Sequence, residues 1–248
     1  IHPNSCARDT VSDESVLDFD MLQTGHGDSS SLPNTVNIVT KEYARKPFMP
    51  VINGEVCYEG IGEGCRQEVQ RLMFWTCMLN GAAGHTYGAN GIWQVNTREK
   101  SYGPSPHGMS WGGVPWEDAL QLPGSKQLGL ARSFLERYKW WQLVPHPEWI
   151  EPHFTESDYL QPYAAGIPGE VRIFYFPRFP RGKVLIKEME PGVVYHVFLF
   201  NPVNGTEHVL GQATADPDGT WVLQEGYDLT GRFVFPIYQD WVLVMEKM

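Results

Sequence analysis

Two stretches decide how this chain is interpreted: NGEVCYEG at residues 53–60 and GAAGHTYG at residues 81–88. Each follows a short apolar run, at residues 48–52 and 78–83, and each places carboxylate, imidazole or phenol groups on a glycine-rich turn. A stretch rich in Arg and aromatic residues, with helix-like spacing, joins the two. Alternating strands and helices bring such turns to one rim of an α/β barrel. The order of elements therefore predicts parallel strands with polar side chains at their ends.

The composition is that of a globular protein and argues against several classes of partner. Of the 248 residues, 42% are hydrophobic and 19% charged, and the apolar runs are too short to span a bilayer. The net charge of −10 argues against nucleic acid, because phosphate binding needs a basic surface. Neutral glycans are compatible with this charge. The nine Trp could be buried in large cores or could stack on sugars. For any single Trp, burial in a core is the more common role.

Four cysteines, Cys6, Cys57, Cys65 and Cys77, are scattered over the first third of the chain without a C-x-x-C pair. Zinc and redox motifs need tight local spacing, so we expect no metal and no other cofactor. Free buried thiols are the default, and a Cys57–Cys65 disulfide is the minor alternative. The chain does not begin with Met, and we expect any targeting segment to lie upstream of Ile1.

In residues 1–143, short apolar runs alternate with amphipathic stretches, which predicts an α/β arrangement. The expected strands are residues 16–22 and 48–53. The expected helices are residues 32–45, 67–79 and 116–140. Residues 92–114 read as a long loop, and loops of that length usually have a function or no fixed structure.

After residue 143 the pattern changes to short β-type runs separated by turn signals, with no helical pattern between them. The runs are residues 171–176, 184–187, 193–200, 209–213, 220–223 and 241–245. They predict an antiparallel β-sandwich over residues 144–248. The Pro-rich stretch 144–152 marks the boundary with residues 1–143, so the predicted fold class is α/β plus all-β.

Glu55 is the strongest single candidate for chemistry, because it follows an apolar strand and a Gly that leaves its backbone uncrowded. Hydrolysis of a glycosidic bond normally requires two carboxyl groups. Glu59 is a weaker candidate, and a surface loop carboxylate is the plain alternative for either residue. The motifs of α/β-hydrolases, dinucleotide-binding folds and H-E-x-x-H zinc enzymes are absent from the sequence.

Polar residues recur at four strand-like ends. They are His2, Gln23 with His26, Glu55, and His85 with Tyr87. Taken alone, each of these histidines would most simply be a structural residue held by hydrogen bonds. Their recurrence at one end of each unit favours a shared site.

These segments resemble the C-terminal half of the catalytic domain of the apiosidase-like glycoside hydrolases, a TIM-type (β/α)8 barrel. The matching pieces are residues 1–3 for the end of the fifth strand, 17–26 for the sixth, 50–55 for the seventh and 81–93 for the eighth. The later residues resemble the β-sandwich that commonly follows this barrel and has carried a collagen-binding label. Its matching pieces are residues 159–162, 166–169 and 240–244.

The resemblance implies a retaining glycoside hydrolase that acts on plant cell-wall or pectic polysaccharide, with Glu55 as its nucleophile. The residues that it places around the sugar are Gln23, His26, His85, Tyr87 and Trp93. It also favours a secreted or periplasmic location. Trp93, Trp111 and Trp116 could stack on sugar faces.

The acid/base carboxylate of such barrels ends the fourth strand, which would precede Ile1. Asp18 and Asp20 are poor substitutes, because they belong to the middle of a predicted strand. The expected partners are therefore an oligo- or polysaccharide and the missing N-terminal half of the barrel, from the same precursor or from a second chain. Three readings stay open: a fragment of a longer enzyme, one chain of a split barrel, or a remnant without catalysis.

A function from a different class is also open. The chain could be a non-catalytic carbohydrate-binding or scaffold protein, which a complete sandwich without an acid/base residue would suit. A plainer option is that the sandwich only braces the barrel.

Overall fold

The computed structural model describes residues 1–99, 111–180, 182–223 and 235–248. By their internal contacts these residues form two compact units, Ile1–Gly129 and Leu130–Met248. The division falls inside a helix, whereas the composition places a domain boundary at 143/144; the assignment of residues 1–143 and 144–248 to two domains stays a prediction. No helix in the described ranges combines the length and apolar character needed to cross a bilayer.

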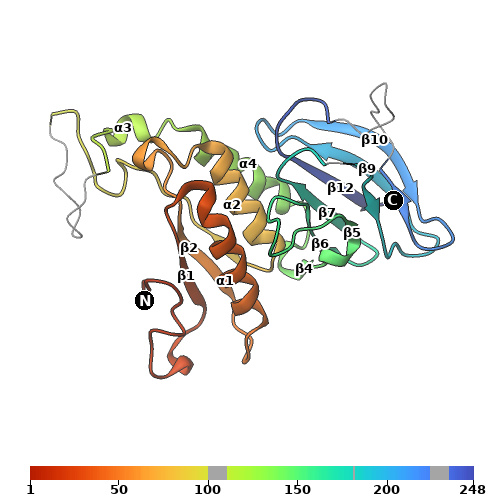
Figure 1. Cartoon of the computed structure of the whole chain (residues 1–248), viewed down its shortest axis with the longest axis horizontal. Coiled ribbons are helices and arrows are strands. Elements are labelled where there is room, and N and C mark those ends of the chain that lie inside the picture. The colour runs from red at the N-terminus through yellow and green to blue at the C-terminus, as the bar shows by residue number, and fades with distance from the viewer. Residues whose placement is uncertain (100–110, 181, 224–234) are drawn as a thin grey trace. The chain divides into compact units, whose positions relative to one another are not determined.

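The first unit is built on a parallel sheet of three strands, in the order β1-β2-β3. The strands are β1 (Asp20–Gly25), β2 (Val51–Val56) and β3 (Gly84–His85). Helix α1 (Leu32–Ala44) connects β1 to β2 and packs against both, and α2 (Gln67–Leu79) connects β2 to β3 and contacts α1 (Figure 1). Parallel strands joined by crossover helices end at the same edge of the sheet, which gathers the residues at their ends.

The expected helices at residues 32–45 and 67–79 are confirmed as α1 and α2, but both early strands start later than expected. Residues 14–16 form a 3₁₀ turn, capped by the Asp13 side chain, which includes the first residue of the strand expected at 16–22. Pro47 and Pro50 cannot donate to a ladder, and β2 begins only at Val51. Glu55 consequently lies within β2, one residue before its end, rather than after the strand.

The expected helix over residues 116–140 is two helices, α3 (Trp116–Ala119) and α4 (Pro123–Leu135). Pro123 begins α4, because a residue without an N–H fits the first turn of a helix. Leu128, Ala131 and Phe134 of α4 are buried, whereas Leu120, between the two helices, is 51% exposed. Part of the expected loop at 92–114, residues 100–110, lies outside the described residues.

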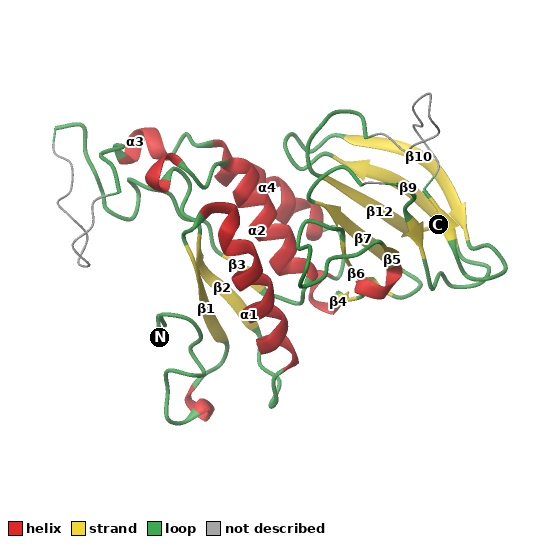
Figure 2. Ribbon diagram, viewed as in Figure 1, coloured by secondary structure: helices red, strands yellow, loops and turns green. Residues whose placement is uncertain are grey.

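The second unit holds two antiparallel sheets (Figure 2). Six strands pair in the order β10-β9-β12-β7-β6-β4, and three pair in the order β11-β8-β5. The strands of the larger sheet are β4 (Val144–Pro145), β6 (Tyr163–Ile167), β7 (Val171–Phe176), β9 (Val194–Phe200), β10 (Glu207–Thr214) and β12 (Trp241–Lys247). Those of the smaller sheet are β5 (Ile150–Glu151), β8 (Leu185–Ile186) and β11 (Trp221–Val222).

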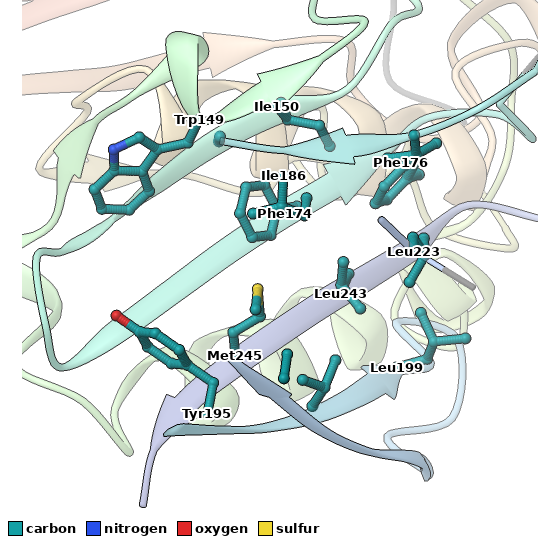
Figure 3. Packing of buried hydrophobic residues seen from close by; sticks show 14 of the residues in the cluster. Trp149, Ile150, Phe174, Phe176, Ile186, Tyr195, Leu199, Leu223, Leu243 and Met245 are labelled. Atoms are coloured by element: carbon teal, nitrogen blue, oxygen red, sulfur yellow. The ribbon is translucent and has the colours of Figure 1, made fainter. Parts of the chain in front are cut away.

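A single buried cluster draws on both of these sheets (Figure 3). Phe174 and Phe176 on β7 and Leu243 and Met245 on β12 are two residues apart on their strands, so they share one face of the larger sheet. Ile186 of the smaller sheet belongs to the same cluster. Burying side chains of this size stabilises the unit by about 1.5–3 kcal/mol each.

Candidate active site

Glu55 stands at the edge where the parallel strands end. In the register of β1 and β2, Gln23 is its direct partner, and the register shifts on both sides of Gln23. Such irregularities turn side chains at a strand end toward one point. The sheet therefore places an amide beside the carboxylate of Glu55 by backbone pairing alone.

Three side-chain nitrogens lie within hydrogen-bond distance of the Glu55 carboxylate. Oε1 lies 2.8 Å from Nε2 of Gln23 and 2.7 Å from Nε2 of His26. Oε2 lies 2.7 Å from Nε2 of His2, whose side chain is 52% exposed. The Glu55 side chain itself is only 12% exposed. Both oxygens are thus oriented, and the His2 side is the one nearer solvent.

The tautomer of His26 follows from its second contact. Its Nδ1 lies 3.4 Å from the backbone N of Tyr58, and an N–H can only donate. Nδ1 is then the acceptor, so Nε2 carries the hydrogen that is donated to Glu55. His26 acts here as a fixed hydrogen-bond donor to Glu55 through Nε2.

Glu55 is held in its ionised form. Burial raises the pKa of the carboxyl, but hydrogen bonds from His26 and Tyr58 and the charges of His26 and His2 lower it further, so the pKa lies below its usual value. Burial, followed by the hydrogen bond to Glu55, raises the pKa of Tyr58. An ionised carboxylate in a half-buried site is suited to nucleophilic attack.

Four aromatic rings lie next to one another beside Glu55. His26 lies 4.6 Å from Tyr58 and 5.6 Å from Trp111, measured between ring centroids. Trp93 lies 6.4 Å from Tyr58 and 5.5 Å from Trp111. The amide of Asn90 donates to the carbonyl of Trp111 over 2.6 Å and anchors it. We call His26, Tyr58, Trp93 and Trp111 the aromatic cluster; flat apolar faces of this kind stack well on sugar rings.

Glu59 is fully buried and has a different set of partners. Tyr87 donates its hydroxyl to Oε2 over 2.6 Å, and the backbone N–H of Gly124 donates to the same oxygen over 3.0 Å. Burial raises the pKa of Glu59 above its usual value, although the hydrogen bonds from Tyr87 and Gly124 oppose the rise. Glu59 therefore ties two loops to the start of α4, and Tyr87 is bonded to it rather than to Glu55.

His85 lies on β3, opposite Asn53 of β2. Both of its ring nitrogens are buried, and neither has a hydrogen-bond partner among the described residues, although part of the residue reaches the surface. Its ring meets Phe74 edge-on at 5.6 Å. Burial lowers the pKa of His85 to about 4, so the imidazole is neutral near pH 7.

The structure thus brings Gln23, His26 and Glu55 into one hydrogen-bonded group and joins Trp93 to it through Tyr58. Tyr58 was not singled out in the sequence. It returns to Glu55 because Cys57, directly after β2, has a positive φ of 42°. Cys rarely signals such a turn, which Gly or Asn would have indicated.

One group of residues outside this site has the composition of a metal site. Ligand atoms of Cys6, Asp20 and Glu42, all buried, lie within 4.8 Å of one another. The Cys6 thiol donates to Asp20, and Glu42 pairs with Arg45 over 3.2 Å. Burial, with the Asp20 hydrogen bond, raises the pKa of Cys6 to about 12, so without a metal ion it is a thiol that donates to Asp20. We assign this group to structure.

Comparison with known proteins adds the family. The model of the apiosidase-like catalytic domain matches residues 1–142, more than half of the chain and all of the residues around Glu55. The chain belongs to the apiosidase-like family. A search of curated proteins found no match.

Two solved structures share the fold of this apiosidase-like chain. One, described as a glycoside hydrolase, has 22% identity and a TM-score of 0.73 over 93% of this chain and 52% of its own. The other, a glycoside hydrolase family 5 protein from Bacteroides vulgatus, has 21% identity and a TM-score of 0.76 over 98% and 53%. The apiosidase-like chain spans about half the length of each.

Proposed function

We propose that this chain is part of a retaining glycoside hydrolase in which Glu55 is the nucleophile. The observation that carries the proposal is the ionised Glu55 carboxylate at the strand edge, with three side-chain nitrogens within hydrogen-bond distance and the aromatic cluster beside it. Gln23 and His26 orient Oε1, which leaves Oε2, on the side of the half-exposed His2, to attack the anomeric carbon.

The reaction has two steps. Glu55 forms a bond to the anomeric carbon while the glycosidic bond breaks, and an acid/base carboxyl about 5–5.5 Å away gives its proton to the departing oxygen. Water, deprotonated by the same acid/base group, then breaks the covalent intermediate and restores Glu55. Glu59 is a poor choice for the second carboxyl, because Tyr87 and Gly124 occupy it. We place the acid/base outside this chain.

We further propose that the first domain, residues 1–143, is the C-terminal half of a (β/α)8 barrel and that residues 144–248 are an antiparallel β-sandwich. Three parallel strands with crossover helices, and two antiparallel sheets that share one core, support this. The length of the two structural relatives supports a partner that supplies the other half-barrel, in the same precursor or as a second chain.

For the substrate, we propose a plant cell-wall or pectic polysaccharide. The aromatic cluster provides stacking faces, and His85, Tyr87 and Trp93 complete the subsite. The unpartnered ring nitrogens of His85 and the unpartnered indole N–H of Trp93, among the described residues, support roles in holding sugar hydroxyls, because buried polar atoms are normally bonded.

The test is turnover by the full-length protein. Glu55→Gln should abolish hydrolysis, whereas Glu63→Gln, at an exposed carboxylate in the same loop, should leave it within about twofold, since surface ion pairs contribute little. A 2-deoxy-2-fluoro glycoside should label Glu55 covalently. If Glu55→Gln still hydrolyses the substrate, Glu55 is not the nucleophile.

The second candidate is carbohydrate binding without catalysis. It is favoured because the aromatic cluster forms within this chain, whereas the carboxylate of Glu59 is already bonded to Tyr87 and Gly124. Glycan binding by a full-length protein that turns over no glycoside, with equal affinity in Glu55→Gln, would select it.

A further inference from the structure

Cys57 and Cys65 lie together beneath the loop that carries Tyr58. Both are 1% exposed. Both sulfurs contact the segment 26–28: Sγ of Cys57 lies 3.5 Å from the carbonyl oxygen of Asp28, and Sγ of Cys65 lies 3.8 Å from the carbonyl oxygen of His26. Two sulfurs that are close in space and near one strand end are positioned to bond.

The backbones of the two cysteines are fixed as well. The Nε2 amide of Gln70 donates to the carbonyls of both Cys57 and Cys65. Oδ2 of Asp28 accepts from the N–H of Cys65 over 2.7 Å, and the carbonyl of Gly25 accepts from the N–H of Cys57 over 3.0 Å. One side chain thus bridges both residues, which limits the movement that bond formation requires.

Ordering the loop between the two cysteines costs conformational free energy, because several of its residues adopt backbone conformations that are rarely populated. Cys57, Gly60, Gly62, Glu63 and Cys65 all have positive φ values. A crosslink removes conformational freedom from the unfolded chain, so it would offset part of the free energy that ordering this loop costs.

We propose that Cys57 and Cys65 form a disulfide that closes residues 57–65 and fixes Tyr58 against Glu55. The neighbouring Cys57 thiol lowers the pKa of Cys65, and Cys65 in turn raises the pKa of Cys57, so Cys65 is the attacking group. When local opening of the loop exposes Cys65, its thiolate attacks a disulfide oxidant, such as oxidised glutathione, and displaces one thiol. Cys57 then loses its proton and attacks the Cys65 sulfur, which releases the second thiol. Two protein thiols are oxidised to one disulfide, and the oxidant is reduced to two thiols.

Trypsin separates the cysteines conveniently. Cleavage after Arg45 and Arg66 gives the peptide 46–66, since the bond before Pro47 resists the enzyme; it holds Cys57 and Cys65 alone. Cys6 falls in the peptide 1–8 and Cys77 in the peptide 72–98. The full-length protein is incubated with oxidised glutathione, denatured, alkylated without reduction and digested.

We expect the peptide 46–66 to be lighter by two hydrogen atoms and to carry no alkyl group, while the peptides with Cys6 and Cys77 are each alkylated. Two alkyl groups on 46–66, or its crosslinking to another peptide, would overturn the proposal. Oxidation should also raise the melting temperature of wild type by roughly 5 °C or more and leave Cys65→Ser unchanged. Equal melting of oxidised and reduced wild type would show that the bond does not fix the loop.

Discussion

Oε2 of Glu59 accepts the backbone N–H of Gly124 over 3.0 Å, across 65 residues of chain. The contact needs the absence of a side chain at 124: a Cβ there would lie 2.3 Å from that oxygen and 2.8 Å from Cγ of Gln70. Because Tyr87 also holds Glu59, the carboxylate cannot move aside cheaply.

Gly124→Ala should therefore lower the free energy of unfolding by about 1–3 kcal/mol. Gly129→Ala is the matched control in the same helix, because nothing lies within 4 Å of its Cβ position. There the better helix propensity of Ala should stabilise by up to about 1 kcal/mol. Urea denaturation of both variants measures the difference, and equal stabilities would contradict the packing argument.

The raised pKa of Glu59 predicts a pH dependence of stability. Since burial raises the folded-state pKa above the unfolded value of about 4.3, the folded state binds more protons, and stability falls as pH rises from the unfolded to the folded pKa. Glu59→Gln keeps the shape and removes the titration. The stability lost by Glu59→Gln relative to wild type should be largest near pH 4 and should shrink toward pH 7. Denaturant unfolding at both pH values tests it; a difference independent of pH would refute the buried titration.

Tyr58→Phe should change the acid limb of the activity profile. Loss of the phenol hydrogen bond removes one cause of the lowered pKa of Glu55, so that pKa should rise and the acid limb of kcat/KM should move to higher pH. Tyr43→Phe, on α1, is the control and should leave the limb in place. The measurement is a pH profile of the full-length protein, and an unmoved limb in Tyr58→Phe would exclude this role.

In the second unit, replacing Arg172 by Ala should lower the stability more than replacing Arg132 by Ala. Its side chain is fully buried, donates to the carbonyl of Lys187 over 2.9 Å, pairs with Glu190 over 3.1 Å and lies 3.9 Å over the Trp149 ring. Arg172→Ala should cost about 3 kcal/mol, because it leaves buried acceptors unpaired. Arg132→Ala, which breaks an exposed pair with Glu136, should cost no more than about 0.5 kcal/mol. Thermal unfolding compares the two variants. A loss of stability in Arg172→Ala as small as that in Arg132→Ala would show that the buried contacts of Arg172 contribute little.

Local patterns predicted much of the fold. The helical spacing of residues 32–45 and 67–79 corresponds to α1 and α2, and each of the six β-type runs after residue 143 contains or overlaps a strand. Strand β6 was missed, because its YAAGI sequence lacks the bulky residues that favour strands. Strand β1 was placed too early, because its alternation of apolar and acidic residues begins before the ladder does.

The site was harder to predict because its contacts are long-range. Glu55 with Gln23 and His26 could be anticipated from strand ends that meet at one edge. The pairing of Tyr87 with Glu59 could not, since a phenol and a carboxylate 28 residues apart carry no spacing signal. The same holds for the unpartnered nitrogens of His85, which depend on packing against Phe74.

The backbone pairing of residues 5–7 with β1 has a practical consequence. Ser5 and Ala7 bond to Gln23 and Met21 along the outer side of β1, and this carries His2 to the Glu55 carboxylate. Any polypeptide fused before Ile1, a purification tag included, therefore emerges one residue from an imidazole that binds Glu55.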